Sequence, residues 1–382
     1  MKILILTISL GQGHNSVANC IAKQLNVMGQ ENIIIDMYAY ISPLLKEIMS
    51  RGYLFTMDSA AKLRPLAKEV YHLNENRQID SDELSISSII KHFQASELRK
   101  FIDHYRPDVI ICTQVYTAQV VALLKGSGCT NAFSIGIVTD FTIQTYWQDT
   151  LELDFIVTAT SQLEYQLKQR GIPPQKMLPF GIPIDSKFKT KMPTAAARRS
   201  LGISESLPTM LVMGGSMGFG KIEDEIQELD MLEFNFQCMV VCGSNNKLFN
   251  KLTSIKPAHC FQIYSYTNQI DIMMSASDLI ITKPGGVTTS EALAMGLPII
   301  IVNPIPGMEE RNTEFLCAAG AAINVTKTFT LAEAVSMVLH YPQNKHRLSQ
   351  AALSLSQPDS TLTLCSFIEK QLTQVIDFPQ PE

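Results

Sequence analysis

The 382-residue sequence lacks any segment with the 18 or so continuous apolar residues that a membrane-spanning helix needs. At the amino end, Lys2 precedes a short apolar run that is broken at Gly11, and the cleavage region of a signal peptide is missing. The sequence therefore predicts a cytoplasmic protein without a transmembrane helix.

Paired cysteines are also missing. The 8 cysteines are scattered, mostly within apolar runs, with no C-x-x-C pair and no histidine at a metal-binding spacing. Cys238 and Cys242 lie in a strand-like run, where both should point to the same face. Such thiols are typical of core residues in a reducing compartment, so the pattern predicts neither disulfides nor a metal site.

An excess of positive charge is absent as well. The formal net charge is -5 at pH 7 and the isoelectric point is near 5.9. Nucleic-acid-binding proteins need a basic surface, so this balance argues against a nucleic-acid partner. With 46% hydrophobic and 18% charged residues, the chain can form two domains, each with a full core.

What the sequence does contain is a repeated unit of apolar strand, glycine-rich loop and helix. The loops are SLGQGH at 9–14, GGSMGFG at 214–220 and KPGG at 283–286. The start of a helix favours the binding of a phosphate, because its first amides are unpaired and its dipole is positive there. Glycine has no side chain, so the phosphate can approach the backbone closely. A single Gly-Gly is more often an ordinary strand-to-helix turn. Three such loops predict a protein built around a nucleotide.

Continuous apolar strands alternate with helical patterns along the whole chain. In the first half they lie at 2–7, 33–37, 108–113, 133–139 and 154–160, and the second half repeats the scheme. Such strands imply parallel sheets covered on both faces, with ligands at the carboxyl ends of the strands. The fold class predicted is α/β, with two doubly wound Rossmann-like domains facing across a cleft. They span 1–190 and 205–360, residues 183–208 contain the linker, and a carboxyl-terminal helix in 361–382 could cross back to the first domain.

Five motifs resemble those of glycosyltransferase family 28, and within it the group of monogalactosyldiacylglycerol synthase and processive diacylglycerol glucosyltransferase. They are ILTISLGQGHNSVA at 5–18, IVTDFTIQTYW at 137–147, GIPI at 181–184, VMGGSMGFGKI at 212–222 and TKPGGVTTSEALAMGLPIIIVNPIPGMEERN at 282–312. The last is the most specific. The resemblance implies a GT-B fold and an inverting transfer from a UDP-sugar, without a metal or other cofactor.

Such a transfer needs one base, because the acceptor hydroxyl attacks the anomeric carbon in a single step. His14 is the predicted base, since it lies in the first helical turn after the loop and resembles the histidine of the family's glycine loop. The helix terminus should lower its pKa. A capping or surface histidine is the alternative. Asp140, just past a strand, is predicted to orient the base or the acceptor, and a turn or helix cap is the equal alternative.

Donor binding follows from the resemblance. Gly215, Ser216, Gly285, Gly286 and Thr288 are assigned to the diphosphate, Glu291 to the ribose, and the backbone at Tyr266 and Thr267 to the uracil edge. Glu309 and Asn312 are expected to reach the sugar hydroxyls, although a solvated helix start is the alternative for the acids at 309 and 310. The predicted donor site as a whole is Gly13, Gly215, Ser216, Tyr266, Thr267, Lys283, Gly285, Gly286, Val287, Thr288, Glu291, Glu309 and Asn312.

Gln144 and Trp147 are predicted to belong to the acceptor region. The family usually has histidine where this chain has Gln144, glutamine at Met308 and an acid at Arg311. Because Gln144 can donate a hydrogen bond but cannot shuttle a proton, acceptor handling and sugar choice could differ.

Residues 43–73 form a candidate membrane-contact segment. Apolar positions at helical spacing are interleaved with Lys46, Arg51, Lys62, Arg64 and Lys68. An apolar face with such cations can lie in a membrane interface and meet a lipid acceptor. The alternative is that these helices pack on the sheet of the first domain.

The sequence therefore predicts a peripheral, cytoplasmic inverting hexosyltransferase. It would move glucose or galactose from UDP to a lipid hydroxyl, above all that of diacylglycerol, and make a β-glycolipid. Four alternatives stay open. They are a UDP-GlcNAc transferase that completes lipid II, a transferase with a soluble acceptor, a non-catalytic UDP-sugar sensor and a UDP-GlcNAc 2-epimerase. Sugar, processivity and oligomeric state stay open.

Overall fold

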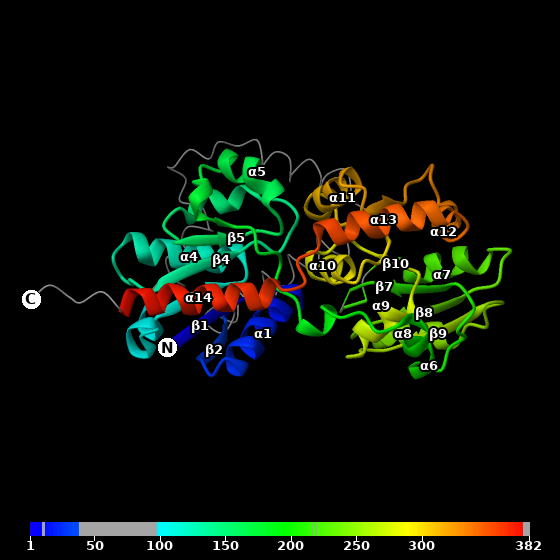
Figure 1. Ribbon diagram of the computed structural model, residues 1–382, viewed down its shortest axis with the longest axis horizontal. Helices are drawn as coiled ribbons and strands as arrows, with labels where there is room; N and C mark the ends of the chain where they lie inside the picture. The colour runs from blue at the N-terminus through cyan, green and yellow to red at the C-terminus, as the bar shows by residue number, and fades with distance from the viewer. Residues whose placement is uncertain (10–11, 38–97, 216, 219, 377–382) are drawn as a thin grey trace, which may run out of the picture. The chain divides into compact units, whose positions relative to one another are not determined.

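The computed structural model describes residues 1–9, 12–37, 98–215, 217–218 and 220–376 (Figure 1). The chain divides into two compact units. Unit 1 comprises Met1–Asp185 and Asp359–Glu382, and unit 2 comprises Ser186–Pro358. Each unit holds one six-stranded parallel sheet, so the predicted pair of doubly wound α/β domains is confirmed. In the described part of the chain, no helix has the length and apolar content required to cross a bilayer.

The sheet of unit 1 has the order β2-β1-β3-β4-β5-β6. After β1 the chain moves outward to β2 and then returns to the other side of β1 at β3. The adjacent carboxyl ends of β1 and β3 therefore form a topological switch point, where open α/β sheets bind ligands. The strands are β1 (Lys2–Thr7), β2 (Glu31–Asp36), β3 (Val109–Cys112), β4 (Phe133–Ile137), β5 (Phe155–Val157) and β6 (Met177–Leu178).

Helices cover this sheet. They are α1 (Gln12–Val27), α4 (Val115–Gly126), α5 (Glu164–Gln169) and α14 (Ser360–Ile376), with the 3-10 helices η2 (Thr145–Thr150), η3 (Ser161–Leu163) and η4 (Pro174–Lys176). Residues 98–105 are also helical.

The last helix of the chain, α14, belongs to unit 1, where it lies beside α1 (Figure 1). The Phe367 ring of α14 meets Phe155 at 5.3 Å and Phe180 at 5.4 Å between centroids. Leu364, Cys365 and Ile368 are fully buried, and Thr361 donates to the carbonyl of Ile184 at 2.7 Å. The apolar stripe of α14 thus completes the core of unit 1.

The sheet of unit 2 has the order β12-β11-β10-β7-β8-β9, and its switch point lies between β7 and β10. The strands are β7 (Thr209–Met213), β8 (Gln237–Val241), β9 (Cys260–Tyr264), β10 (Leu279–Thr282), β11 (Ile299–Ile301) and β12 (Ala322–Asn324). The helices are η5 (Ser186–Phe188), α6 (Thr194–Ser200), α7 (Ile222–Asp230), α8 (Asn246–Thr253), α9 (Ile270–Ala276), α10 (Gly286–Ala294), α11 (Met308–Ala318), α12 (Leu331–Leu339) and α13 (Pro342–Leu355).

Much of the segment predicted as a linker is structured. Helix α6 lies in unit 2, and its Arg198 side chain is only 6% exposed. The guanidinium donates to the carbonyl of Ala276 at 2.9 Å and to the carboxylate of Asp278 at 2.8 Å, and Lys345 reaches the same carboxylate at 2.5 Å. The predicted linker therefore includes a helix with a buried, paired arginine.

Candidate functional site

His14 lies at the switch point of unit 1. It is the third residue of α1 and is half-buried. Its Nδ1 atom lies 2.8 Å from the carbonyl oxygen of Thr113 and 3.3 Å from the hydroxyl of Thr139. Thr113 directly follows β3, and Thr139 lies just after β4. Because a carbonyl can only accept, Nδ1 carries a proton, and in the neutral imidazole Nε2 is then unprotonated.

The surroundings of His14 favour the neutral imidazole. Burial lowers the pKa of His14 below its usual 6.5, and the hydrogen bond to Thr113 opposes part of that shift. The predicted direction of the pKa shift is confirmed, although burial is its largest cause. A neutral ring with an unprotonated Nε2 can accept a proton at neutral pH.

Asn15 fixes the first turn of α1 to the end of β1. Its Oδ1 accepts a hydrogen bond from Thr7 at 2.9 Å, and its Nδ2 donates to Ser9 at 3.0 Å. Asn15 and the threonines beside His14 were not among the predicted site residues. Their common signal is a position at or beside the carboxyl end of a parallel strand, where side chains from different loops meet.

Asp140 and Gln144 form a second polar group in the same unit. Both are half-buried, and the Gln144 amide donates to Asp140 at 3.2 Å. Asp140 follows Thr139, so its backbone is tied to the loop that touches His14. Asp140 is therefore one residue from a side chain that contacts His14, and its role in orienting the base or the acceptor stays a prediction.

Trp147 is a core residue. Its side chain is 3% exposed, and a Cβ atom at Gly136 in β4 would lie 2.7 Å from its ring. The indole therefore fills the space that the missing side chain of Gly136 leaves open. Any influence of Trp147 on an acceptor passes through the packing of β4 and η2.

In unit 2, Lys283 lies where the loops after β7 and β10 meet. Its ammonium group pairs with the carboxylate of Glu309, which is 6% exposed and also accepts the N–H of Ile305 at 2.9 Å. A Cβ atom at Gly215, which has φ +70°, would lie 3.3 Å from Cε of Lys283. The two glycine loops and the start of α11 thus converge on one cation. Glu309 is therefore buried and paired rather than part of a solvated helix start.

The amino end of α10 faces this cation. Gly285 occupies the N-cap position without a capping side chain, and a Cβ atom there would lie 3.5 Å from Nζ of Lys283. Gly286 begins the helix, and Val287, Thr288 and Glu291 follow, all three half-buried. Unpaired amides, a helix dipole and an ammonium group together suit an anionic diphosphate.

Asn312 supports the loop from α11. It is fully buried, and its amide donates to the carbonyl of Pro284 at 3.0 Å. The sequence prediction had Asn312 contacting a sugar hydroxyl. This bond holds the Pro284-Gly285 backbone, because a buried carbonyl needs a donor. The contact of Asn312 with a sugar hydroxyl stays a prediction.

The remaining predicted donor residues belong to other segments of the chain or lie outside the described residues. Tyr266 is 65% exposed after β9, and the Thr267 hydroxyl accepts the N–H of Gln269 at 3.2 Å. Gly13 is exposed on α1 in unit 1. Ser216 and the segment 43–73 lie outside the described residues.

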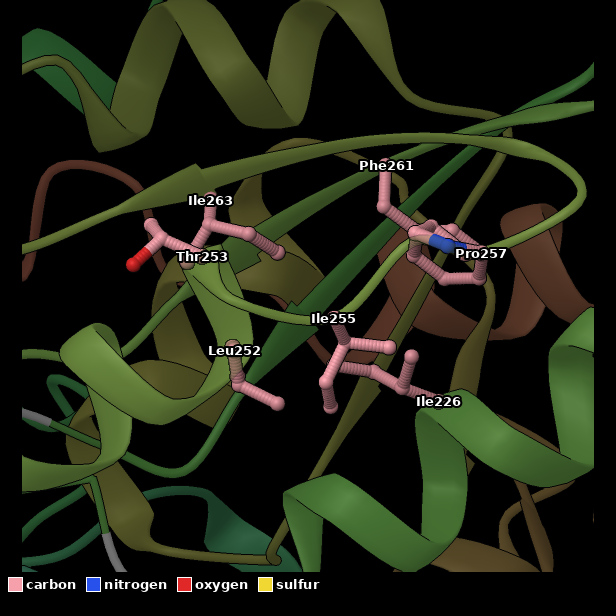
Figure 2. Close-up of a pocket in the computed structure, with 7 residues that line it drawn as sticks. All are labelled: Ile226, Leu252, Thr253, Ile255, Pro257, Phe261 and Ile263. Atoms are coloured by element: carbon pink, nitrogen blue, oxygen red, sulfur yellow. The ribbon is translucent and has the colours of Figure 1, made fainter.

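Unit 2 also contains a cavity of about 230 Å³ between α7, α8 and β9, lined mainly by apolar residues (Figure 2). Its lining consists of Ile226, Leu252, Thr253, Ile255, Pro257, Phe261 and Ile263. The Thr253 hydroxyl already donates to the carbonyls of Phe249 and Asn250. A diphosphate needs charge and donors, so this cavity does not suit a nucleotide.

Comparison with known sequences separates the chain into two domains. Residues 14–184 match the model of monogalactosyldiacylglycerol (MGDG) synthase, and residues 209–361 match that of the glycosyltransferase family 28 C-terminal domain. The chain is 28% identical over 376 residues to a processive diacylglycerol beta-glucosyltransferase of Bacillus pumilus, covering 97% of this chain and 95% of the relative. The enzyme of the same name from Staphylococcus saprophyticus is 28% identical over 369 residues, covering 95% and 91%.

Solved structures support the fold. MurG of Acinetobacter baumannii is similar with a TM-score of 0.60 at 16% identity, covering 97% of this chain and 99% of MurG. A UDP-GlcNAc 2-epimerase of Neisseria meningitidis has a TM-score of 0.61 at 15% identity, covering 97% and 100%. At these identities the likeness shows the fold alone, and the predicted GT-B fold is confirmed. With an MGDG synthase domain followed by a family 28 C-terminal domain, the chain is a glycosyltransferase of family 28.

Proposed function

We propose that this enzyme transfers a hexose from a UDP-sugar to a lipid hydroxyl, above all that of diacylglycerol, with inversion at the anomeric carbon. The observation that carries the proposal is His14, whose Nδ1 is held by Thr113 so that Nε2 can act as a base. Relatives named processive diacylglycerol beta-glucosyltransferase favour glucose as the sugar and diacylglycerol as the acceptor.

In the proposed step, the acceptor oxygen attacks the anomeric carbon while its proton passes to Nε2 of His14. A new carbon–oxygen bond forms on the acceptor side, and the bond between the anomeric carbon and UDP breaks. UDP leaves with the bonding electron pair, and the product is a β-glycolipid. Asp140, next in the chain to Thr139, positions the acceptor or the base.

The leaving diphosphate needs positive groups, because negative charge grows on it as the bond breaks. Lys283 and the amino end of α10 supply that charge, and Glu309 holds Lys283 in place. Gly215 and Ser216 complete the proposed cradle, Glu291 takes the ribose, and the backbone at Tyr266 and Thr267 takes the uracil. This set of charges supports a transfer that needs no metal or cofactor.

The test is an activity screen of the purified protein with UDP-glucose, UDP-galactose and UDP-GlcNAc against diacylglycerol in mixed micelles. We expect glycolipid from UDP-glucose or UDP-galactose, and the same rate in the presence of EDTA. UDP release without a glycolipid would redirect the acceptor to a soluble molecule. Loss of activity with EDTA would overturn the metal-independent mechanism, and a failure to bind UDP would overturn the whole proposal.

We further infer a cytoplasmic enzyme that lies on the inner face of the cell membrane. A diacylglycerol acceptor resides in a bilayer, and the cations interleaved with apolar residues at 43–73 suit an anionic surface. Co-sedimentation with anionic and neutral lipid vesicles tests this inference. Absence of binding to both kinds of vesicle would contradict a lipid acceptor.

A further inference from the structure

Glu225 is a buried acid in the donor unit that the proposed transfer does not use. It lies on α7, directly after the glycine loop at 214–220, and is 7% exposed. The side-chain amide of Asn303 donates to its carboxylate at 2.6 Å. A buried carboxyl group is costly unless it is hydrogen-bonded, so the contact with Asn303 is a substantial one.

Asn303 has a backbone conformation that few residues adopt. It follows β11 and has φ +47°, which costs a non-glycine residue free energy unless its surroundings hold it. The end of the glycine loop lies beside the same amide, because a Cβ atom at Gly220 would be 3.8 Å from Nδ2 of Asn303. Asn303 therefore joins the loop after β7 to the loop after β11.

The loop that Asn303 begins leads directly to the phosphate cradle. Two residues later, the N–H of Ile305 donates to Glu309, and Glu309 pairs with Lys283. At the end of the loop, Gly307 has φ +84° and donates its N–H to Glu310 at 3.2 Å. A change in the backbone at Asn303 would thus shift the carboxylate of Glu309, which pairs with Lys283.

Resting on the proposed UDP-sugar donor, we propose that Glu225 is a positioning residue of the donor site. By holding Asn303, it fixes the loop at 303–307 so that Glu309 keeps Lys283 between Gly215 and Gly285. Glu225 acts only through these residues and is assigned no contact with the donor.

The charge of Glu225 offers a readout that a purely structural role would not give. Burial raises the pKa of Glu225 to about 7, the hydrogen bond from Asn303 opposes the shift, and the neighbouring acids Asp224 and Glu228 add to it. The Cys238 thiol of β8 also interacts electrostatically with Glu225. Its pKa is raised mainly by burial. Because an ionised carboxylate is the stronger acceptor, the hold on Asn303 tightens as pH rises through about 7.

The experiment measures UDP affinity by calorimetry from pH 6 to pH 8 for the full chain and for three variants. Glu225→Gln retains the acceptor oxygen but cannot ionise. We expect it to match the wild type at pH 6 and to bind UDP roughly fivefold more weakly at pH 8, the difference between a charged and a neutral hydrogen bond. Asn303→Gly tolerates the positive φ but lacks the amide, and should bind UDP roughly tenfold more weakly at pH 8. Glu223→Gln is the control, because it makes the same change on the same helix at a residue that pairs with Lys251. Its UDP affinity should match that of the wild type at each pH.

Kinetics supply a second readout. The KM for the UDP-sugar should rise in Glu225→Gln and Asn303→Gly and kcat should fall, because the loop holds the cation that meets the charge growing on the leaving diphosphate. The KM for the acceptor should stay within about twofold, because the loop belongs to unit 2 and is assigned no contact with the acceptor. If the wild type fails to bind UDP, the proposed function is wrong. If the wild type binds UDP and Glu225→Gln keeps its affinity and its pH dependence, the role of Glu225 is wrong and the proposed function stands.

Discussion

At the scale of single residues, the candidate site depends on side chains whose state is set by burial. His14 is half-buried and Glu225 is buried, and burial disfavours the charged form of each. The consequence is opposite in direction, because the histidine loses its charge by releasing a proton and the acid by binding one. His14 is thereby ready to accept a proton, and Glu225 titrates near neutrality.

Replacing His14 with alanine should remove the base and leave the donor unit intact. We expect kcat to fall by about 10³-fold, within the usual contribution of general base catalysis, with an unchanged dissociation constant for UDP. Steady-state kinetics and calorimetry measure the two quantities. His104→Ala, at an exposed histidine of the same unit, is the matched control. Retention of more than a tenth of the wild-type kcat in His14→Ala would exclude His14 as the base.

The titration of Glu225 also predicts a pH dependence of stability. Its folded pKa is raised from 4.5 to about 7, so the folded protein binds the proton more tightly than the unfolded chain. Stability is therefore lost as pH rises through this range. Glu225→Gln avoids that loss and should be more stable than the wild type at pH 8, by at most about 3 kcal/mol, and similar to it at pH 5. Denaturant unfolding at the two pH values tests the sign, and a variant that is less stable at pH 8 would contradict it.

At the scale of elements, strands and helices were easier to predict than the contacts between them. A strand that is buried on both faces appears in the sequence as a continuous apolar run. For this reason β3 could be predicted, and it lies within the predicted range 108–113. The position of His14 in the first turn of α1 also followed from the local pattern.

Pairings between distant residues could not be predicted in this way. Lys283 and Glu309 are 26 residues apart, and only the folded sheet brings the loop after β10 to the start of α11. The support that Asn312 gives to Pro284, and the tie between Glu225 and Asn303, depend on the same long-range geometry. The burial of Arg198 in α6 could not be predicted either, because its partners Ala276 and Asp278 lie about 80 residues later in the chain.

The packing of η2 on β4 makes a prediction at this scale. Gly136→Ala would place a methyl group 2.7 Å from the Trp147 ring and 3.0 Å from Leu153, so the indole or the strand must shift. We expect a loss of about 1–3 kcal/mol in the free energy of unfolding. Gly126→Ala is the control, because its methyl group would meet only the flexible side chain of Glu152 at 3.3 Å. Equal stability of the two variants in denaturant unfolding would show that Trp147 is not tightly packed.

At the scale of the whole molecule, the two units differ in how the chain builds them. Unit 2 is one continuous stretch, whereas unit 1 combines the first 185 residues with α14. The buried side chains of α14 are therefore indispensable to unit 1 and absent from unit 2.

Truncation after Pro358 should consequently unfold unit 1 selectively. The deleted helix buries Leu364, Cys365 and Ile368 fully, and each aliphatic side chain is worth about 2 kcal/mol. We expect calorimetry to show loss of one thermal transition and retention of the transition that UDP stabilises. A chain ending at Ile376, which keeps α14, is the control. A truncated protein with both transitions intact would contradict the assignment of α14 to unit 1.

The late position of α14 in the chain also bears on synthesis at the ribosome. Unit 1, although it contains the first strand, can be completed only after all of unit 2 has been made. Unit 2 can fold while translation continues, whereas the apolar surface of unit 1 that α14 covers stays exposed until the helix has been made. An interrupted translation product would therefore carry a folded unit 2 and an incomplete unit 1, and the proposed transfer, which needs both, would become possible only once α14 has been made.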